Sequence, residues 1–168
     1  FYDPGYYLAN PIEMLKTWKG GLASHGGTLG VFLAVLVYAR RDHRSALWVL
    51  DRLGIAVAPV AALIRVGNLF NHEIYGHVTS MPWGFRFIEN VGAWSRGAEP
   101  VYTEPCHPTQ IYEALCYLAV FAVNAYLYYK TDARNRRGLL LGVFFTGVFG
   151  SRFLIEYVKN VQVSFEEG

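Results

Sequence analysis

Four long apolar stretches limit what this chain can fold into. They cover residues 22–39, 46–64, 111–129 and 138–158, and the first contains no Lys, Arg, Asp or Glu. A helix of about 20 mostly apolar residues crosses the hydrocarbon core of a bilayer. A proline inside such a helix, as at position 59, is tolerated. We therefore predict an all-α fold, a polytopic integral membrane helical bundle with about four transmembrane helices.

The composition agrees with a membrane protein and excludes several function classes. The chain has 168 residues, of which 53% are hydrophobic and 17% charged, and its net charge is +2. Such a small net charge gives no reason to expect nucleic acid as a partner. The two cysteines, Cys106 and Cys116, have no metal-binding spacing, and no phosphate-binding or dinucleotide-binding loop is present. We expect one membrane-embedded domain over residues 1–168, with no metal and no cofactor.

The positive charges predict the orientation of the helices. Lys and Arg cluster in the segments that join the first span to the second and the third to the fourth, and cytoplasmic loops are enriched in these residues. Residues 65–109 then lie on the outer face of the membrane, where we expect them to form a loop or small cap. Eight of the fifteen Lys and Arg residues make this cluster, three in the first segment with Arg52 nearby and four in the second: Arg40, Arg41, Arg44, Arg52, Lys130, Arg134, Arg136 and Arg137.

The densest polar motif follows the second apolar stretch. Arg65, Asn68, Asn71 and Glu73 lie within nine residues of one another. Ionisable groups near hydrocarbon are tolerated where they are paired and face a protein interior or a watered cavity, so they indicate a functional site. The alternative is a solvated loop, which the helix-breaking residues that follow would also fit.

Histidines begin two further motifs on the expected outer face. His25 is followed by two glycines, which allow another chain or a lipid headgroup to approach the backbone. His107 precedes the third span, in register with Gln110 and close to Glu113. Structural alternatives stay open for both. For His25 the alternative is a packed, hydrogen-bonded histidine. For His107 and the residues after it, the alternative is a helix cap with an acidic first turn favoured by the helix dipole.

The fourth motif is Arg152 and Glu156 in the last span. Their spacing of four residues places them on one helix face, where they can form an ion pair. Arginine is also the side chain best shaped to bind phosphate, because its planar fork of donors matches the phosphate oxygens. Arg65 offers a second fork of the same kind.

One apparent metal motif does not hold. His72 and Glu73, followed by His77, are similar to part of a zinc-protease helix. However, histidines five residues apart lie about 140° apart around an α-helix, and a zinc site of that kind needs both on one face. The sequence therefore predicts no zinc site.

Taken together, the four motifs resemble those of the bacterial phosphatidylglycerol–prolipoprotein diacylglyceryl transferases. Members of that family are longer, with additional spans on both sides, so this chain is expected to be a core fragment. A tyrosine that some members carry one turn before the last arginine is Val148 here, so a role for that hydroxyl does not carry over. The matching motifs are His25-Gly-Gly, Arg65-Val-Gly-Asn68-Leu-Phe-Asn71-His-Glu73-Ile-Tyr-Gly76, His107-Pro-Thr-Gln110-Ile-Tyr112-Glu113 and Arg152-Phe-Leu-Ile-Glu156.

The resemblance implies a reaction and its partners. Such enzymes transfer diacylglyceryl from phosphatidylglycerol to the lipobox cysteine thiol of a prolipoprotein, which forms a thioether and releases glycerol 1-phosphate. This is the first step of lipoprotein maturation. It implies a multi-pass protein of the bacterial inner membrane, in contact with membrane lipid and a prolipoprotein signal peptide, with its active face toward the outer leaflet.

The resemblance also implies roles for the motif residues. His25 would accept the thiol proton, and Arg65 and Arg152 would bind the phosphate, so these three are the expected catalytic residues. The nucleophile belongs to the substrate, so Cys106 and Cys116 need no catalytic role. The expected substrate-binding residues are Arg65, Asn68, Asn71, Glu73, Gly76, His107, Gln110, Glu113 and Glu156.

A different class of function stays open. A transporter or an anionic-lipid-binding module could use the same arginines to bind a headgroup without making a bond. Many transporters are built from internal repeats. The first two spans do not resemble the last two, so the sequence favours the enzyme.

The predicted orientation can be tested by cysteine labelling. In a background without Cys106 and Cys116, a cysteine at Ser95 should react with a membrane-impermeant reagent added from outside, and one at Asn135 should not. Labelling in the reverse pattern would place residues 65–109 in the cytoplasm and contradict the outer-face site.

Overall fold

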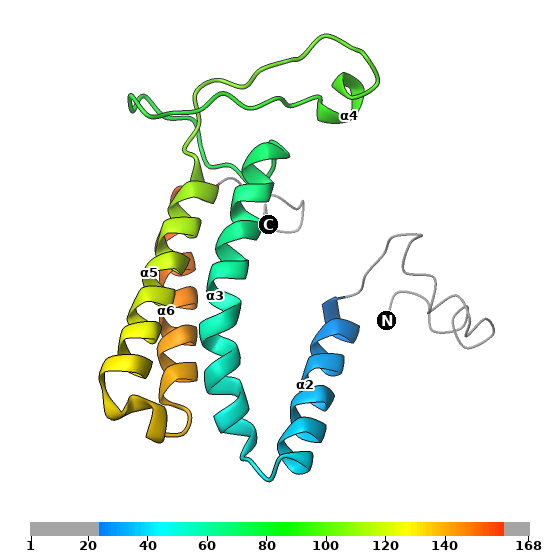
Figure 1. Cartoon of the computed structure of the whole chain (residues 1–168). Helices are drawn as coiled ribbons and strands as arrows, with labels where there is room; N and C mark the ends of the chain where they lie inside the picture. Colours follow the sequence, from blue (N-terminus) through cyan, green and yellow to red (C-terminus); the bar gives the residue numbers. More distant parts are fainter. Residues whose placement is uncertain (1–23, 160–168) are drawn as a thin grey trace, which may run out of the picture. The chain divides into compact units, whose positions relative to one another are not determined.

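A computed structural model describes residues 24–159 of the chain, which divides into two units, Phe1–Ala46 and Leu47–Gly168. Each unit is considered by itself. The first contains helix α2 (Ser24–Arg41), and α3 (Ala46–Phe70) begins at the boundary. The second continues with α4 (Val91–Trp94), α5 (Thr109–Lys130), a 3₁₀ helix (Asp132–Asn135) and α6 (Leu139–Glu156), as labelled in Figure 1. Residues 24–159 contain helices and isolated β-bridges but no strand, which confirms the all-α prediction.

Three of these helices are long and apolar enough to cross a membrane. They are α3, α5 and α6, each of at least 18 residues. The search covered the described residues, and α2 is not among the helices found. The first turns of α2 carry Ser24, His25, glycines and Thr28, which lower its hydropathy. The chain is therefore that of a helical membrane protein, while a membrane crossing by residues 22–39 stays a prediction.

Helix α3 continues beyond its expected end. The sequence predicted a span that stops at residue 64, but the helix ends at Phe70. Gly67 and Asn68 are poor helix formers, but helix propensity is a weak preference that tertiary contacts override. Arg65 and Asn68 consequently lie on the last turns of a helix, and the connection to α5 runs from residue 71 to residue 108.

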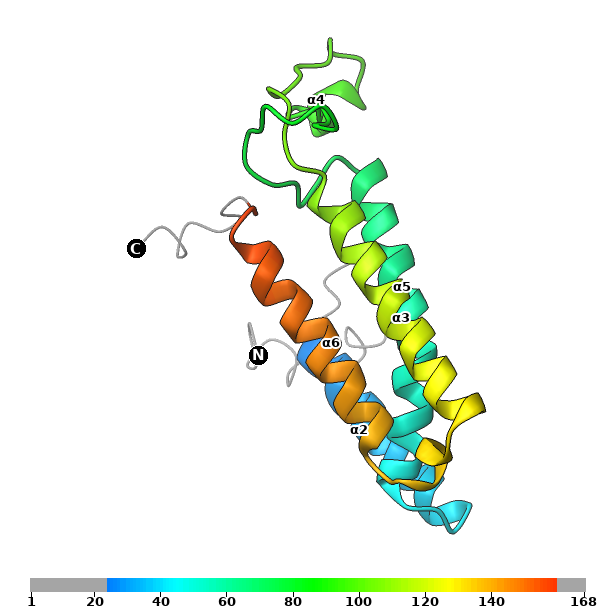
Figure 2. The same ribbon diagram turned by 90° about the vertical axis from the view of Figure 1, so that its left-hand side faces the viewer.

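Helices α3, α5 and α6 pack together through small residues. Gly54 of α3 lies against Phe144, since a methyl group added at Gly54 would be 3.3 Å from its Cβ. Gly147 of α6 lies against Val120 of α5 in the same way. Small residues allow membrane helices to approach closely, because lipid provides no hydrophobic force between them. Figures 1 and 2 show the three helices running alongside one another, with the connection 71–108 beyond the ends of α3 and α5.

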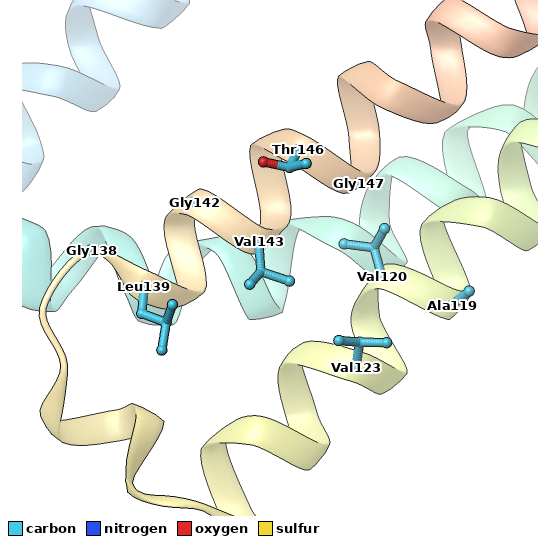
Figure 3. A pocket seen from close by; sticks show the side chains of 9 residues that line it. All are labelled: Ala119, Val120, Val123, Gly138, Leu139, Gly142, Val143, Thr146 and Gly147. Atoms are coloured by element: carbon cyan, nitrogen blue, oxygen red, sulfur yellow. The ribbon is translucent and has the colours of Figure 1, made fainter.

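An open apolar groove of about 570 Å³ runs between α5 and α6 (Figure 3). It has no titratable side chain, so it offers no group for acid–base chemistry. The groove is therefore not the chemical site. Its lining consists of Ala119, Val120, Val123, Gly138, Leu139, Gly142, Val143, Thr146 and Gly147.

The connection 71–108 has a small core of its own. Phe87 and Ile88 are buried, with 1% and 4% of their surfaces exposed. The Phe87 ring stacks on Tyr75 at a centroid distance of 4.6 Å, and its backbone N–H donates to Thr103 Oγ1. These contacts fold the connection into a cap, as expected for the outer loop.

Asp51 joins α3 to the first turn of α6. Its carboxylate accepts hydrogen bonds from the backbone N–H groups of Gly138 at 2.7 Å and Leu141 at 2.9 Å. The first N–H groups of a helix have no partner within the helix, and a negative charge there is favoured by the helix dipole. Asp51 is only 3% exposed, so it acts as a helix cap supplied by another helix.

Replacing this carboxylate should destabilise the fold. Asp51→Asn removes the charge and one acceptor oxygen, so we expect unfolding free energy in detergent to fall by about 1.5–3 kcal/mol, as for hydrogen bonds to charged groups. Asp42→Asn is the control, because Asp42 forms an exposed ion pair with Arg44 and such pairs contribute about 0–1 kcal/mol. Equal unfolding temperatures for the two variants would contradict the capping role.

Candidate functional site

The centre of the candidate site is an ion pair between two membrane-spanning helices. Arg65, near the end of α3, places its Nε–H against Oε2 of Glu113, on the second turn of α5. The side chains are 14% and 2% exposed. Breaking a buried pair leaves an uncompensated charge, which is strongly destabilising. Two residues from different sequence motifs thus meet, and each fixes the position of the other.

A chain of hydrogen bonds extends from Arg65 toward the surface. Its Nη1 donates to Asn68 Oδ1 at 3.4 Å, and Asn68 Nδ2 donates to Glu73 Oε1 at 2.6 Å. Asn71 Nδ2 donates to the same oxygen at 3.3 Å. The structure therefore brings the four predicted residues of this motif together, with the Glu73 carboxylate exposed at the end of the chain.

The turn that carries Glu73 is strained and is held by α5. His72 and Ile74 have φ angles of 56° and 63°, a region that is unfavourable for a β-branched residue such as isoleucine. The first turn of α5 supports the turn, because Gln110 Nε2 donates to the Glu73 carbonyl at 2.7 Å and Thr109 Oγ1 donates to the Ile74 carbonyl at 2.8 Å. Gln110 is 1% exposed, and its Oε1 has no partner among the described residues.

Gly76 is enclosed by neighbouring segments. Its backbone N–H donates to the His107 carbonyl at 2.9 Å. A methyl group here would lie 2.8 Å from Thr109 Cγ2 and 2.9 Å from His107 Cβ, which is too close for real contacts. Close packing therefore explains the glycine, and its predicted contact with substrate stays a prediction.

The pair between Arg152 and Glu156 that their spacing permits does not form among the described residues. Glu156 instead lies 3.8 Å from Lys159, and its side chain is 57% exposed. Within residues 24–159, Arg152 forms no ion pair, and it is exposed. The spacing of four residues permits a pair, but at an exposed helix end two long side chains gain little from holding one geometry. The arginine is therefore not neutralised by Glu156.

Tyr117 is a site residue that the sequence analysis missed. It lies one helical turn after Glu113, is 3% exposed and packs against Ala62 of α3. Its hydroxyl interacts electrostatically with Arg65 and Arg152. A tyrosine in an apolar helix is usually part of the packed core. The spacing of four residues between Tyr117 and Glu113 was the signal that could have identified it.

The cysteines do not join the site as nucleophiles. Both Cys106 and Cys116 are free. Cys106 is 2% exposed, and burial raises the pKa of its thiol. Because the thiolate is the reactive form, a raised pKa makes the thiol less reactive at neutral pH. No group of three His, Cys, Asp or Glu residues suited to a metal occurs within residues 24–159.

His25 lies in the first turn of α2, and its side chain is outside the described part of the chain. Its predicted role as the base therefore stays a prediction. The remaining site residues lie around the C-terminal end of α3, the N-terminal end of α5 and the C-terminal end of α6.

The sequence was compared with known protein families. Residues 1–167 match the family described as prolipoprotein diacylglyceryl transferase. The chain belongs to this family. The resemblance drawn from the motifs is thereby confirmed, and all four motifs fall within the matched residues.

Relatives from three bacteria give the degree of similarity, and each is named phosphatidylglycerol–prolipoprotein diacylglyceryl transferase. The protein of Porphyromonas gingivalis is 57% identical over 168 residues, which are 99% of this chain and 59% of the relative. That of Chloroherpeton thalassium is 45% identical, over 98% of this chain and 58% of the relative. The protein of Tolumonas auensis is 44% identical, over 99% of this chain and 60% of the relative. The chain thus spans about three fifths of the length of these relatives.

Proposed function

We propose that the complete protein transfers the diacylglyceryl group of phosphatidylglycerol to the lipobox cysteine of a prolipoprotein. The thiolate sulfur attacks the carbon of the diacylglyceryl group that is bonded to a phosphate oxygen. A C–S bond forms, and the bond between that carbon and the phosphate oxygen breaks. Glycerol 1-phosphate leaves with the electron pair of that bond. The observation that carries the proposal is the buried Arg65–Glu113 pair at the membrane-spanning helix ends of a chain that belongs to this family.

The reaction needs two things from the protein. A cysteine thiol with a pKa near 8.5 is mostly protonated at neutral pH, so a group must accept its proton. Negative charge also develops on the departing phosphate ester, and preorganised donors stabilise such charge most effectively. The nucleophile comes from the substrate, which agrees with the burial that raises the pKa of the Cys106 thiol and makes it less reactive.

Arg65 is suited to binding the phosphate because its guanidinium is held in place. A guanidinium has five N–H donors, and the contacts with Glu113 and Asn68 use only some of them. We assign the remaining donors to the phosphate. The ion pair orients the fork in advance, so little further reorganisation is needed when charge develops.

Arg152 provides the second positive charge. It is exposed and is not neutralised by an acid within residues 24–159, so it can bind an anion without first breaking an ion pair. Tyr117 interacts electrostatically with both arginines, which makes it a common neighbour of the two charges. A phosphate held by both would have its charge balanced from two helices, α3 and α6.

The glycerol part of the headgroup requires hydrogen-bond donors and acceptors from the protein. Phosphatidylglycerol carries free glycerol hydroxyls, which can both donate and accept hydrogen bonds. The exposed Glu73 carboxylate, held by Asn68 and Asn71, is an acceptor at the outer end of the site. Gln110, which donates to the Glu73 carbonyl, has in its Oε1 an acceptor without a partner among residues 24–159. We assign these groups to the headgroup, and His25 to the thiol proton.

The same proposal includes the location of the reaction. Phosphatidylglycerol and a translocated prolipoprotein must meet on one side of the membrane. The positive-inside rule places residues 71–108 and the ends of α3 and α5 at the outer face of the cytoplasmic membrane. The candidate site therefore faces the leaflet where both substrates are available.

Lysine should not replace either arginine. The complete protein in membranes can be assayed for transfer of labelled diacylglyceryl to a lipobox peptide. For Arg65→Lys and Arg152→Lys we expect turnover to fall about 10²-fold or more, because a point charge lacks the planar fork of donors. Arg137→Lys, in the exposed segment before α6, is the matched control. Near-normal turnover of both site variants would contradict phosphate binding by these arginines.

His25→Gln should separate proton transfer from lipid binding. We expect turnover to fall by about 10²–10⁴-fold, the usual effect of losing a general base, with phosphatidylglycerol binding largely kept. Raising the pH should partly restore the rate, because the substrate thiol then ionises without a base. His77→Gln, at an exposed position, is the control. Loss of lipid binding without alkaline recovery would make His25 a headgroup or structural residue.

A further inference from the structure

Three side chains form a hydrogen-bonded row beside the candidate site. The indole Nε1–H of Trp83, in the connection 71–108, lies 2.9 Å from the hydroxyl oxygen of Tyr112 on α5. That hydroxyl lies 3.1 Å from Nδ1 of His107. Trp83 and Tyr112 are 29 residues apart in sequence, so the row exists only because the connection folds back over the start of α5.

The chemistry of each group gives the row a direction. An indole N–H can only donate, so the Tyr112 oxygen accepts from Trp83. The hydroxyl still has its own hydrogen, and His107 Nδ1 is the acceptor within reach. Hydrogen bonds in a row polarise one another, so the first donation strengthens the second. When the hydroxyl donates this hydrogen to Nδ1, the proton of a neutral His107 ring is on Nε2.

The backbone of His107 is fixed independently of its ring. Its N–H donates to the His77 carbonyl at 3.0 Å, and its carbonyl accepts from Gly76 at 2.9 Å. The His107 and Tyr112 rings meet edge to face at a centroid distance of 6.0 Å. With the backbone held on both sides, the Tyr112 hydroxyl determines which ring nitrogen carries the proton.

We propose that Trp83 and Tyr112 are positioning residues that hold neutral His107 in the tautomer protonated on Nε2, so that His107 acts toward the substrate as a hydrogen-bond donor. The substrate part of this inference rests on the proposed function. The matching ligand atom is an acceptor, such as a phosphate or glycerol oxygen of the lipid headgroup. In this tautomer Nε2 cannot accept the thiol proton, so His107 does not replace His25 as the base.

Nitrogen NMR of the complete protein with labelled histidine tests the tautomer directly. The signals of His107 are identified by their loss in His107→Gln. We expect a proton on Nε2 and none on Nδ1 in the wild type, and a mixture of both tautomers in Tyr112→Phe, which removes only the hydroxyl. A wild-type proton on Nδ1, or an unchanged tautomer in Tyr112→Phe, would overturn the proposal.

Kinetics test the role toward the substrate. Tyr112→Phe should raise KM for phosphatidylglycerol about fivefold, the effect of one neutral hydrogen bond, with kcat changed less. Trp83→Phe keeps an aromatic ring and should give a smaller change in the same direction. Tyr129→Phe, at a 75% exposed position on the same helix, should change neither KM nor the tautomer.

The two proposals fail in different ways. Unchanged KM in Tyr112→Phe, despite a mixed tautomer and normal wild-type transfer, would overturn the substrate role of His107 and leave the transferase function standing. A wild type that binds phosphatidylglycerol but transfers nothing would overturn the transferase function itself. If Tyr112→Phe does not fold, the His107 tautomer and the KM for phosphatidylglycerol are both measured in Trp83→Phe instead.

Discussion

The candidate site depends on one buried ion pair, Arg65 with Glu113. Both residues lie on helices apolar enough to cross a membrane, where an unpaired charge would be strongly unfavourable. Pairing across α3 and α5 lets each helix carry a charge close to hydrocarbon. The pair also fixes the separation and rotation of the two helices at this end. The hydrogen bonds that Asn68, Thr109 and Gln110 donate to the turn at Glu73 also begin from these two helices.

From that pair the site extends in two directions. On the surface side, Asn68 connects Arg65 to Glu73, and the first turn of α5 holds the strained turn at Ile74. On the membrane side, Tyr117 connects Arg65 with the neighbourhood of Arg152. Strain in a turn persists only where surrounding contacts determine the conformation. Here Thr109 and Gln110 provide those contacts, which gives the helix start a role in shaping the site.

The sequence predicted which segments form helices more accurately than it predicted where those helices end. Apolar length indicated α3, α5 and α6, because the hydrocarbon core sets the length of a spanning helix. The end of α3 was placed too early, since Gly67 and Asn68 have low helix propensity and the contacts that stabilise them come from elsewhere. The spacing of Arg152 and Glu156 permitted an ion pair that does not form, because spacing says that two side chains can meet without saying that the contact is favourable.

The sequence by itself determined a helical membrane chain with its unusual polar residues near one face, and its motifs indicated the family that the comparison confirmed. Only the tertiary structure decided which of those polar residues are partners. Glu113 pairs with Arg65, Tyr117 joins them, and Trp83 reaches Tyr112 across 29 residues. The physical reason is that periodicity reports which residues share a face of one helix. Contacts between helices depend on how those faces pack, and one sequence read alone contains no such distances.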